Sequence, residues 1–354
     1  MNSIDIDGVE VGGNSPPYLV AELSANHAGS LKIAIESITQ AKACGASAVK
    51  LQSYTADSLT LNSSKPDFKI KEGVWSGQTL YELYTDAQMP MEWHEILFEH
   101  ARDIGITCFS SPFDERSVDM LESLGAPAYK IASFELLDLP LIQYVANTGK
   151  PIIISTGMAS KREVIEALEV VRSTGNKKII LLHCISAYPA KNSSMNVRMI
   201  RRLSGDFSVL VGLSDHSIGN TASQAAVAFG ACFIEKHFTL DRSLGGPDSL
   251  FSVEPEEFSF LSKELINTWQ CLGGRSYVAH ESEKVNLQFR RSIYAVNDIP
   301  KGSIVKKSDL RIVRPGYGLK PKYLPDLIGL KVNKDIVFAE AISWDMFETV
   351  NHSV

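Results

Sequence analysis

Eight short apolar segments, each followed by polar or ionisable residues, limit the possible folds of this 354-residue chain more than any other feature. They span residues 18–23, 48–52, 107–110, 128–132, 151–155, 178–183, 208–213 and 231–236. Between most of them lies a segment whose apolar residues have helical spacing. Strands that alternate with helices predict a parallel sheet, and eight such units predict a (β/α)8 TIM barrel.

The polar residues that follow these segments agree with that prediction. In chain order they are Glu22, Lys50, Gln52, Ser110, Ser111, Lys130, Ser133, Glu135, Ser155, Thr156, His183, Ser186, Ser214, Asp215, His216, Glu235 and His237. In a barrel the carboxyl ends of all strands face one cavity, where the catalytic residues of this fold gather. An open doubly wound sheet is the alternative, but it would not bring all eight ends together.

Two of the strand ends carry histidines, His216 and His237. A right-handed crossover brings the ends of successive parallel strands to the same edge, so we expect the two imidazoles to be neighbours. Each lies beside an acidic residue, Asp215 or Glu235, which we expect to fix its tautomer. No third strong ligand is evident, which favours an open site for a weakly held divalent ion of the Mn or Mg type. The alternative is two satisfied structural histidines.

Two lysines, Lys50 and Lys130, end apolar strands, where lysine is rarely buried without a partner. Two ammonium groups with several hydroxyl donors could bind a phosphate. The hydroxyl donors are Ser111, Ser133, Ser186 and Ser214. Lysines that reach the barrel mouth for structural reasons and a Schiff-base lysine are the open alternatives.

Glu22 ends the first barrel strand within the segment AELSANHAG. A carboxylate at the mouth, beside a metal ion, is placed to act as a general acid or base. Its alternative role is that of an ion-pair partner for a neighbouring lysine.

The hydrophobic pattern changes near residue 273, which predicts two domains and a linker. We expect the barrel over residues 1–272, a polar linker over 273–289 and a small separate domain of short strands and turns over 290–354. The connection between residues 52 and 107 is longer than one helix and its loops require, so it contains an insertion. Residues 75–84 of this insertion, from Trp75 to Tyr84, are expected to cover the active face or to pack on the side of the barrel.

Composition and charge indicate which classes of binding partner and which cellular compartment to expect. A net charge of −6 gives no sign of a nucleic-acid surface. The longest apolar runs are only as long as strands, so no membrane span is expected. The acidic N-terminus lacks the features of a signal peptide, and the five cysteines show no paired spacing, so a cytoplasmic location is expected.

Several of these segments together resemble the motifs of the sialic acid synthase family. They are AELSANHAG (21–29), VKLQ (49–52), FSSPFD (109–114), YKIASFE (129–135), STGMA (155–159), GLSDH (212–216) and EKHFTL (235–240). The C-terminal segments RRS (290–292) and RPG (314–316) are similar to the antifreeze-like, or SAF, domain of that family. The resemblance covers nearly the whole chain in the right order.

The resemblance implies that phosphoenolpyruvate condenses with the open-chain aldehyde form of an acetamido sugar, giving a 2-keto acid and phosphate. It implies that His216 and His237 hold a divalent metal ion (Mn, Mg or Co) and that Glu22 serves the proton transfers. The implied phosphoenolpyruvate-binding residues are Lys50, Ser111, Lys130, Ser133, Ser186, Tyr188 and Ser214. No imine is needed in such a reaction, which displaces the Schiff-base alternative.

The segments DSLTLNSSKPDFKIK (57–71), LYELY (80–84) and DSLFS (248–252) favour the branch of the family whose sugar is 2,4-diacetamido-2,4,6-trideoxy-L-altrose. Ser186 supports that branch, whereas His183-Cys184 is typical of the sialate branch. The implied sugar-binding residues are Gln52, Glu135, Asp248 and Arg314.

The resemblance also implies a domain-swapped homodimer, in which Arg314 of one chain reaches the sugar in the other. Two alternatives to the diacetamido branch remain open. One is a synthase for N-acetylmannosamine or the legionaminic acid precursor. The other is a carbohydrate-binding protein that has lost catalysis.

Overall fold

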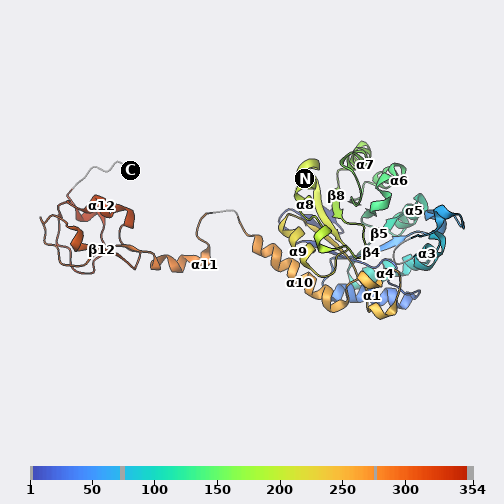
Figure 1. Ribbon diagram of the computed structural model, residues 1–354, viewed down its shortest axis with the longest axis horizontal. Helices are drawn as coiled ribbons and strands as arrows, with labels where there is room; N and C mark the ends of the chain where they lie inside the picture. Colours follow the sequence, from blue (N-terminus) through green and yellow to red (C-terminus); the bar gives the residue numbers. More distant parts are fainter. Residues whose placement is uncertain (1–2, 72–75, 275–276, 349–354) are drawn as a thin grey trace. The chain divides into compact units, whose positions relative to one another are not determined.

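The computed structural model describes residues 3–71, 76–274 and 277–348. The chain divides into two compact units, Met1–Gly273 and Gly274–Val354, and each is described by itself (Figure 1). The first unit holds the barrel, and the second is a small domain rich in turns.

The first unit is built on a closed barrel of eight parallel strands, in the order β10-β3-β4-β5-β6-β7-β8-β9. The strands are β3 (Tyr18–Glu22), β4 (Ala48–Ser53), β5 (Thr107–Pro112), β6 (Tyr129–Ile131), β7 (Ile152–Ser155), β8 (Ile179–Cys184), β9 (Leu210–Asp215) and β10 (Phe233–His237). Consecutive strands are neighbours throughout, and β10 pairs with β3 to close the ring. The prediction of a TIM barrel is confirmed.

One main helix follows each strand, and together these helices surround the barrel (Figure 1). They are α1 (Leu31–Ala43), α4 (Trp93–Ile104), α5 (Glu115–Ser123), α6 (Leu139–Ala146), α7 (Lys161–Ser173), α8 (Met199–Phe207), α9 (Thr221–Ala228) and α10 (Pro255–Leu272). Local signals set their ends: α7 begins at a capping box formed by Ser160 and Glu163, and α4 ends at Gly105, whose φ is 70°. In the described part of the chain, no helix is long and apolar enough to cross a membrane.

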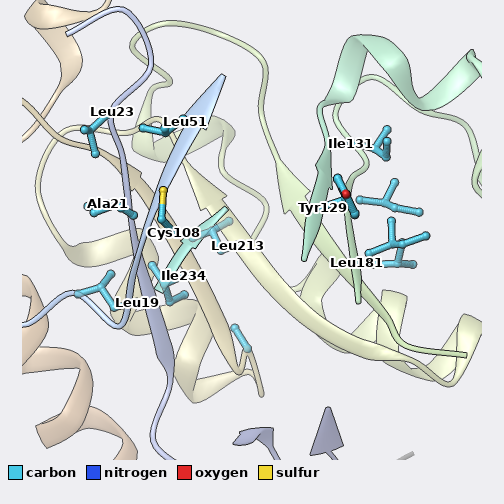
Figure 2. Packing of buried hydrophobic residues seen from close by; sticks show 14 of the residues in the cluster. Leu19, Ala21, Leu23, Leu51, Cys108, Tyr129, Ile131, Leu181, Leu213 and Ile234 are labelled. Atoms are coloured by element: carbon cyan, nitrogen blue, oxygen red, sulfur yellow. The ribbon is translucent and has the colours of Figure 1, made fainter. Parts of the chain in front are cut away.

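Two apolar layers hold the barrel together. The outward-facing residues of the strands, such as Leu19, Leu181 and Ile234, pack in one cluster with the helices (Figure 2). The inward-facing residues form a second cluster with an N-terminal hairpin of β1 (Ser3–Ile6) and β2 (Val9–Gly12). Because the hairpin packs against residues near the strand starts, the opposite end of the barrel is left for polar groups.

The insertion between β4 and β5 contains α2 (Ala56–Leu59) and α3 (Leu80–Ala87). Tyr84 of α3 packs edge-on against Tyr54, which follows β4, with ring centroids 6.0 Å apart. Tyr54 in turn packs against Phe113, which follows β5, at 5.2 Å. Trp75, part of the expected cover, lies outside the described residues, whereas Tyr84 connects the insertion to the end of β4 through Tyr54.

The second unit has its own apolar core, which includes Ile293, Leu327 and Ile342. Two antiparallel strands, β11 (Ser292–Ala295) and β12 (Leu310–Val313), form its only sheet among the residues described there. The short helix α12 (Leu324–Leu327) packs into the same core, and α11 (Glu281–Lys284) precedes it within the segment expected to be a linker.

Candidate active site

Side chains alternate between the inside and the outside of the barrel along each strand, and this decides which polar residues face the cavity. On β10, the Glu235 carboxylate faces inward, where lysines of β4 and β6 contact it. The next residue, Lys236, faces the helix layer and contacts Asp215 there. The structure gathers the predicted site residues of the barrel at its carboxyl end: Glu22, Lys50, Gln52, Ser111, Lys130, Ser133, Glu135, Ser186, Tyr188, Ser214, His216, His237 and Asp248.

A buried cluster of two lysines and two glutamates lies at the centre of this site. Lys50 Nζ is 2.6 Å from Glu22 Oε2 and 3.7 Å from Glu235 Oε1, and it donates to Ser111 Oγ at 3.2 Å. Lys130 Nζ donates to Glu235 Oε1 at 3.1 Å. None of the four charged side chains is more than 4% exposed, so each charge depends on its partners rather than on water.

Burial and mutual attraction shift the pKa values of this cluster in opposite directions. Burial raises the pKa of Glu22 to about 7, although Lys50 opposes that shift. Burial also disfavours the ionised form of Glu235, but Lys130 and Lys50 outweigh it and lower the pKa of Glu235 to about 2. Burial lowers the pKa of Lys130, which Glu235 only partly offsets. Two carboxylates in one cluster therefore differ in their readiness to take up a proton, a pattern typical of acid–base sites.

Several hydroxyl groups lie at the same end of the barrel as the lysines, and two of them lack protein partners in the described part of the chain. The buried Oγ atoms of Ser155 and Ser186 have no hydrogen-bond partner among the described residues. Ser133 Oγ contacts Cys184 Sγ at 2.9 Å and accepts from the Gly157 amide at 3.3 Å. A Cβ at Gly157 would lie only 2.4 Å from Ser186 Oγ, so only glycine lets these groups approach each other. Unpaired hydroxyls and two ammonium groups at one end of the barrel are suited to an anion.

The two histidines are neighbours, as predicted, with ring centroids 5.5 Å apart. His216 Nδ1 lies 2.9 Å from the Ile185 carbonyl oxygen, which fixes the tautomer with Nδ1 protonated. Nε2 is then the unprotonated nitrogen, and it lies 3.3 Å from Ser214 Oγ. Burial lowers the pKa of both imidazoles, and for His237 the neighbouring His216 adds to this effect. Both rings are therefore neutral, the form that binds metal ions.

The prediction that Asp215 and Glu235 fix the tautomers of the two histidines is wrong. Asp215 is the last residue of β9, directly before His216, and its side chain points to the opposite face, toward Lys236 and Ser223. Glu235 is on the inner face but binds lysines and Ser214. A backbone carbonyl orients His216, and the carboxylate nearest to His237 is Asp248, 3.7 Å from Nδ1.

Two of the predicted sugar-binding residues, Gln52 and Asp248, belong to a hydrogen-bonded chain that ends at Glu22. Gln52 Nε2 donates to Glu22 Oε1 at 2.8 Å and to Ser24 Oγ at 3.0 Å. Ser24 Oγ in turn donates to Asp248 Oδ2. Glu135 lies after β6, in the 3-10 helix Ser133–Leu137, and its Oε2 has no partner among the described residues. Arg314 belongs to the second unit, and its role in the site stays a prediction.

Three residues near the site were not assigned a role from the sequence. Gly157 and Cys184 lie next to the hydroxyl groups of Ser133 and Ser186. Ser24 links Gln52 to Asp248. Ser24 has a φ of 44°, which a sequence pattern does not indicate for a serine. Gly157 could have been noticed, because a glycine directly after a strand that ends in Ser155 and Thr156 indicates close approach of other groups.

Replacing Glu135 with glutamine tests the effect of burial on this carboxyl. Burial raises the pKa of Glu135 to about 7, so its ionisation costs stability as the pH rises from about 4.5 through 7. Glutamine does not ionise. From pH 5.5 to pH 8, we therefore expect the unfolding free energy of the variant to gain on the order of 1–2 kcal/mol relative to the parent. Urea unfolding at both pH values measures it, with Glu166→Gln on α7 as control. An equal difference at both pH values would contradict the assignment.

The buried lysines, carboxylates and neutral histidines all lie at the carboxyl ends of the barrel strands. This arrangement is that of a TIM-barrel enzyme whose active site is suited to a small anion. The chain belongs to the NeuB family, which matches residues 37–277, and a SAF domain matches residues 290–348. The predicted membership of the sialic acid synthase family and the predicted C-terminal SAF domain are confirmed.

Named relatives agree with this membership. The chain is 46% identical to the pseudaminic acid synthase of Campylobacter jejuni (strain 81-176), over 92% of this chain and 95% of the relative. It is 36% identical to the N,N'-diacetyllegionaminic acid synthase of Legionella pneumophila, over 97% and 98% of the two chains. Among solved structures, the N-acetylneuraminic acid synthetase of Leptospira borgpetersenii matches with a TM-score of 0.73 and 30% identity, over 81% of this chain and 96% of that one.

Proposed function

We propose that this enzyme condenses phosphoenolpyruvate with 2,4-diacetamido-2,4,6-trideoxy-L-altrose to give pseudaminic acid and phosphate. The observation that carries the proposal is the buried pair Lys50 and Lys130 at the same end of the barrel as unpartnered hydroxyls and two neutral histidines. The sugar follows from the 46% identity to a pseudaminic acid synthase, compared with 36% to a legionaminic acid synthase.

Lys50 and Lys130 would bind the phosphate and carboxylate of phosphoenolpyruvate. Without substrate, the two ammonium groups are neutralised by Glu22 and Glu235. A substrate with several negative charges would compete for these partners, and the hydroxyls of Ser111, Ser133, Ser186 and Ser214, with Tyr188, would supply further donors. The same preformed donors would stabilise negative charge on the departing phosphate without rearrangement.

Glu22 is our candidate for the proton transfers. In the reaction, carbon 3 of phosphoenolpyruvate attacks the aldehyde carbon, and the aldehyde oxygen becomes a hydroxyl by taking up a proton. Water adds at carbon 2 and loses one proton, which balances the proton taken up by the aldehyde oxygen. The bond between carbon 2 and the phosphate oxygen then breaks, the remaining hydroxyl at carbon 2 loses its proton to become a ketone, and the departing phosphate takes up that proton. A carboxyl with a pKa of about 7 can both take up and release a proton near neutral pH.

The residues at the mouth fit the divalent metal ion (Mn, Mg or Co) that the family implies. His216 directly follows β9, His237 ends the adjacent strand β10, and both rings are neutral. His237 Nδ1 is buried without a hydrogen-bond partner among the described residues. In the described part of the chain no group of three or more metal-binding side chains is found, so water and substrate oxygens would complete the shell. When bound, the ion would polarise the aldehyde oxygen as a Lewis acid.

Gln52, Glu135 and Asp248 would contact the hydroxyl and amide groups of the sugar. Gln52 and Asp248 are connected through Ser24 and reach Glu22, so the sugar would lie next to the proton-transfer group. Closeness of this kind orients a flexible open-chain sugar for attack.

We also propose that the enzyme is a domain-swapped homodimer in which Arg314 of a second copy recognises an acetamido carbonyl. Large apolar side chains surround the mouth on the loops after β6, β7, β9 and β10: Phe134, Met158, Ile218 and Leu250 are 64–72% exposed. Such a group of exposed apolar side chains favours a covering partner.

Release of phosphate from phosphoenolpyruvate in the presence of Mn tests the proposal. The 2,4-diacetamido-trideoxy-altrose, the legionaminic acid precursor and N-acetylmannosamine are compared, each before and after chelation of the metal. We expect turnover with the altrose derivative only, and loss of turnover after chelation. Turnover with another sugar instead would keep the reaction and overturn the substrate, and no turnover with any sugar would favour a carbohydrate-binding protein without catalysis.

A further inference from the structure

A second buried ion pair lies outside the cavity, between the barrel and the helix layer. Lys236 Nζ donates to Asp215 Oδ2 at 2.9 Å, and each residue is 1% exposed. Asp215 also accepts from the Ser217 amide at 2.9 Å, from Ser217 Oγ at 2.6 Å and from Ser223 Oγ of α9 at 2.6 Å. Lys236 Nζ donates in addition to the Ser217 carbonyl oxygen at 2.7 Å.

The substrates proposed above do not need this pair, because both side chains point away from the cavity. A buried ion pair is also a poor way to gain stability, since the cost of removing two charges from water offsets most of their attraction. Apolar residues of similar size could fill the same place. The hydrogen-bond set is nevertheless nearly complete, with four donors to the Asp215 carboxylate and two oxygen acceptors for Lys236.

The position of the pair along the strands connects it to the two histidines. Asp215 directly precedes His216, Lys236 directly precedes His237, and the two residues of the pair are register partners on β9 and β10. The same contacts fix Ser217 on the far side of His216. One hydrogen-bonded group therefore fixes the residues on both sides of His216. The same group fixes the residue before His237.

We propose that Asp215 and Lys236 are positioning residues that hold the His216 and His237 rings at the separation needed to bind one divalent ion. The pair acts from behind the strands, through the backbone, and contacts neither substrate nor metal. This inference rests on the proposed function, because it takes the two histidines to be metal ligands. Residues that orient metal ligands in this way contribute about 10- to 100-fold to metal affinity or activity.

The test measures the binding of Mn to the full chain in the absence of substrate. The electron paramagnetic resonance signal of free Mn reports how much of the ion remains unbound. The main variant is the double substitution Asp215→Leu with Lys236→Met, because replacing both charges by apolar groups leaves no unpaired charge in the core. We expect its dissociation constant for Mn to rise by about 10- to 100-fold while the protein remains folded. We also expect kcat to fall while the KM for phosphoenolpyruvate stays within about twofold, because the lysine cluster is untouched.

Asn176→Ala provides the matched control. Asn176 is buried and donates to the Lys150 carbonyl oxygen at 2.8 Å before β8, at the end of the barrel opposite to the site. Its loss is expected to lower the melting temperature and to leave Mn affinity unchanged. If the double variant is less stable but binds Mn within about twofold of the parent, the pair serves stability only and the inference is overturned.

A milder variant keeps the test decisive if the double variant does not fold. Ser223→Ala removes one hydrogen bond to Asp215 from α9 and leaves both charges in place. We expect it to weaken Mn binding by about 3- to 10-fold, and an unchanged dissociation constant would contradict the inference. Binding that is equally tight after His216→Ala with His237→Ala would instead overturn the histidine site of the proposed function, so the two failures are distinguishable.

Discussion

Replacing His237 with alanine is expected to lower turnover with phosphoenolpyruvate and sugar by at least about 1,000-fold. In the proposed metal site, where the described part of the chain offers two protein ligands, the loss of one imidazole would leave the ion without a stable position. The several kcal/mol of charge stabilisation that a metal ion supplies are then lost. Phosphate release at saturating Mn, together with the dissociation constant for Mn, measures the effect.

His183→Ala is the matched control for this substitution. His183 is a buried histidine near the end of β8, but its ring faces outward and its Nε2 lies 2.7 Å from the Met195 carbonyl oxygen. Its removal is expected to reduce stability and to leave Mn binding intact. Turnover of His237→Ala within about tenfold of the parent would mean that the ion, if needed, is held elsewhere.

Replacing Glu22 with glutamine is expected to lower kcat by about 100- to 10,000-fold. The same change should remove one limb of the pH profile. Burial raises the pKa of Glu22 to about 7, so the ionised form that takes a proton from water increases as the pH rises through that value. The kcat/KM of the parent should therefore fall about tenfold per pH unit well below pH 7 and level off above it.

Steady-state rates from pH 5.5 to pH 9 measure both effects. Glu122→Gln is the control, since Glu122 forms an ion pair with Lys150 at the side of the barrel, with its side chain 38% exposed, and should leave the profile unchanged. A glutamine variant at position 22 that is slow but keeps the same acid limb would assign that limb to another group. It would leave Glu22 as a partner of Lys50 only.

The fold and the residues that make up the site could be predicted from the sequence, because both depend on where the strands lie and where they end. Eight apolar segments that alternate with helices fix the barrel, and closure then brings Glu22, Lys50, Lys130, His216 and His237 to one end. The pairing of charges could not be predicted in this way. The contacts of Lys50 with Glu22 and Glu235 depend on the barrel's closed register, which brings β3 and β10 together.

The error about the histidine tautomers has a simple structural cause. Residues next to each other on a strand point to opposite faces, so Asp215 cannot reach the ring of His216. Side chains alternate between the two faces along a strand. If this alternation is continued to the end of β9, it places Asp215 in the outer layer together with Lys236. The carbonyl of Ile185, which orients His216, lies after another strand and gives no signal in the sequence.

The N-terminal hairpin determines how molecules enter and leave the barrel. Ile4, Ile6 and Val11 pack with inward-facing strand residues, so both substrates and both products must use the same opening. Lys50 precedes Gln52 by two residues on β4 and therefore lies deeper in the barrel, about 6.6 Å farther back along the strand. In the proposed function Lys50 binds phosphoenolpyruvate and Gln52 contacts the sugar, so phosphoenolpyruvate would have to arrive before the sugar. For the proposed function, a barrel with a single entrance therefore leads us to expect a compulsory order of addition, with phosphoenolpyruvate first and sugar second.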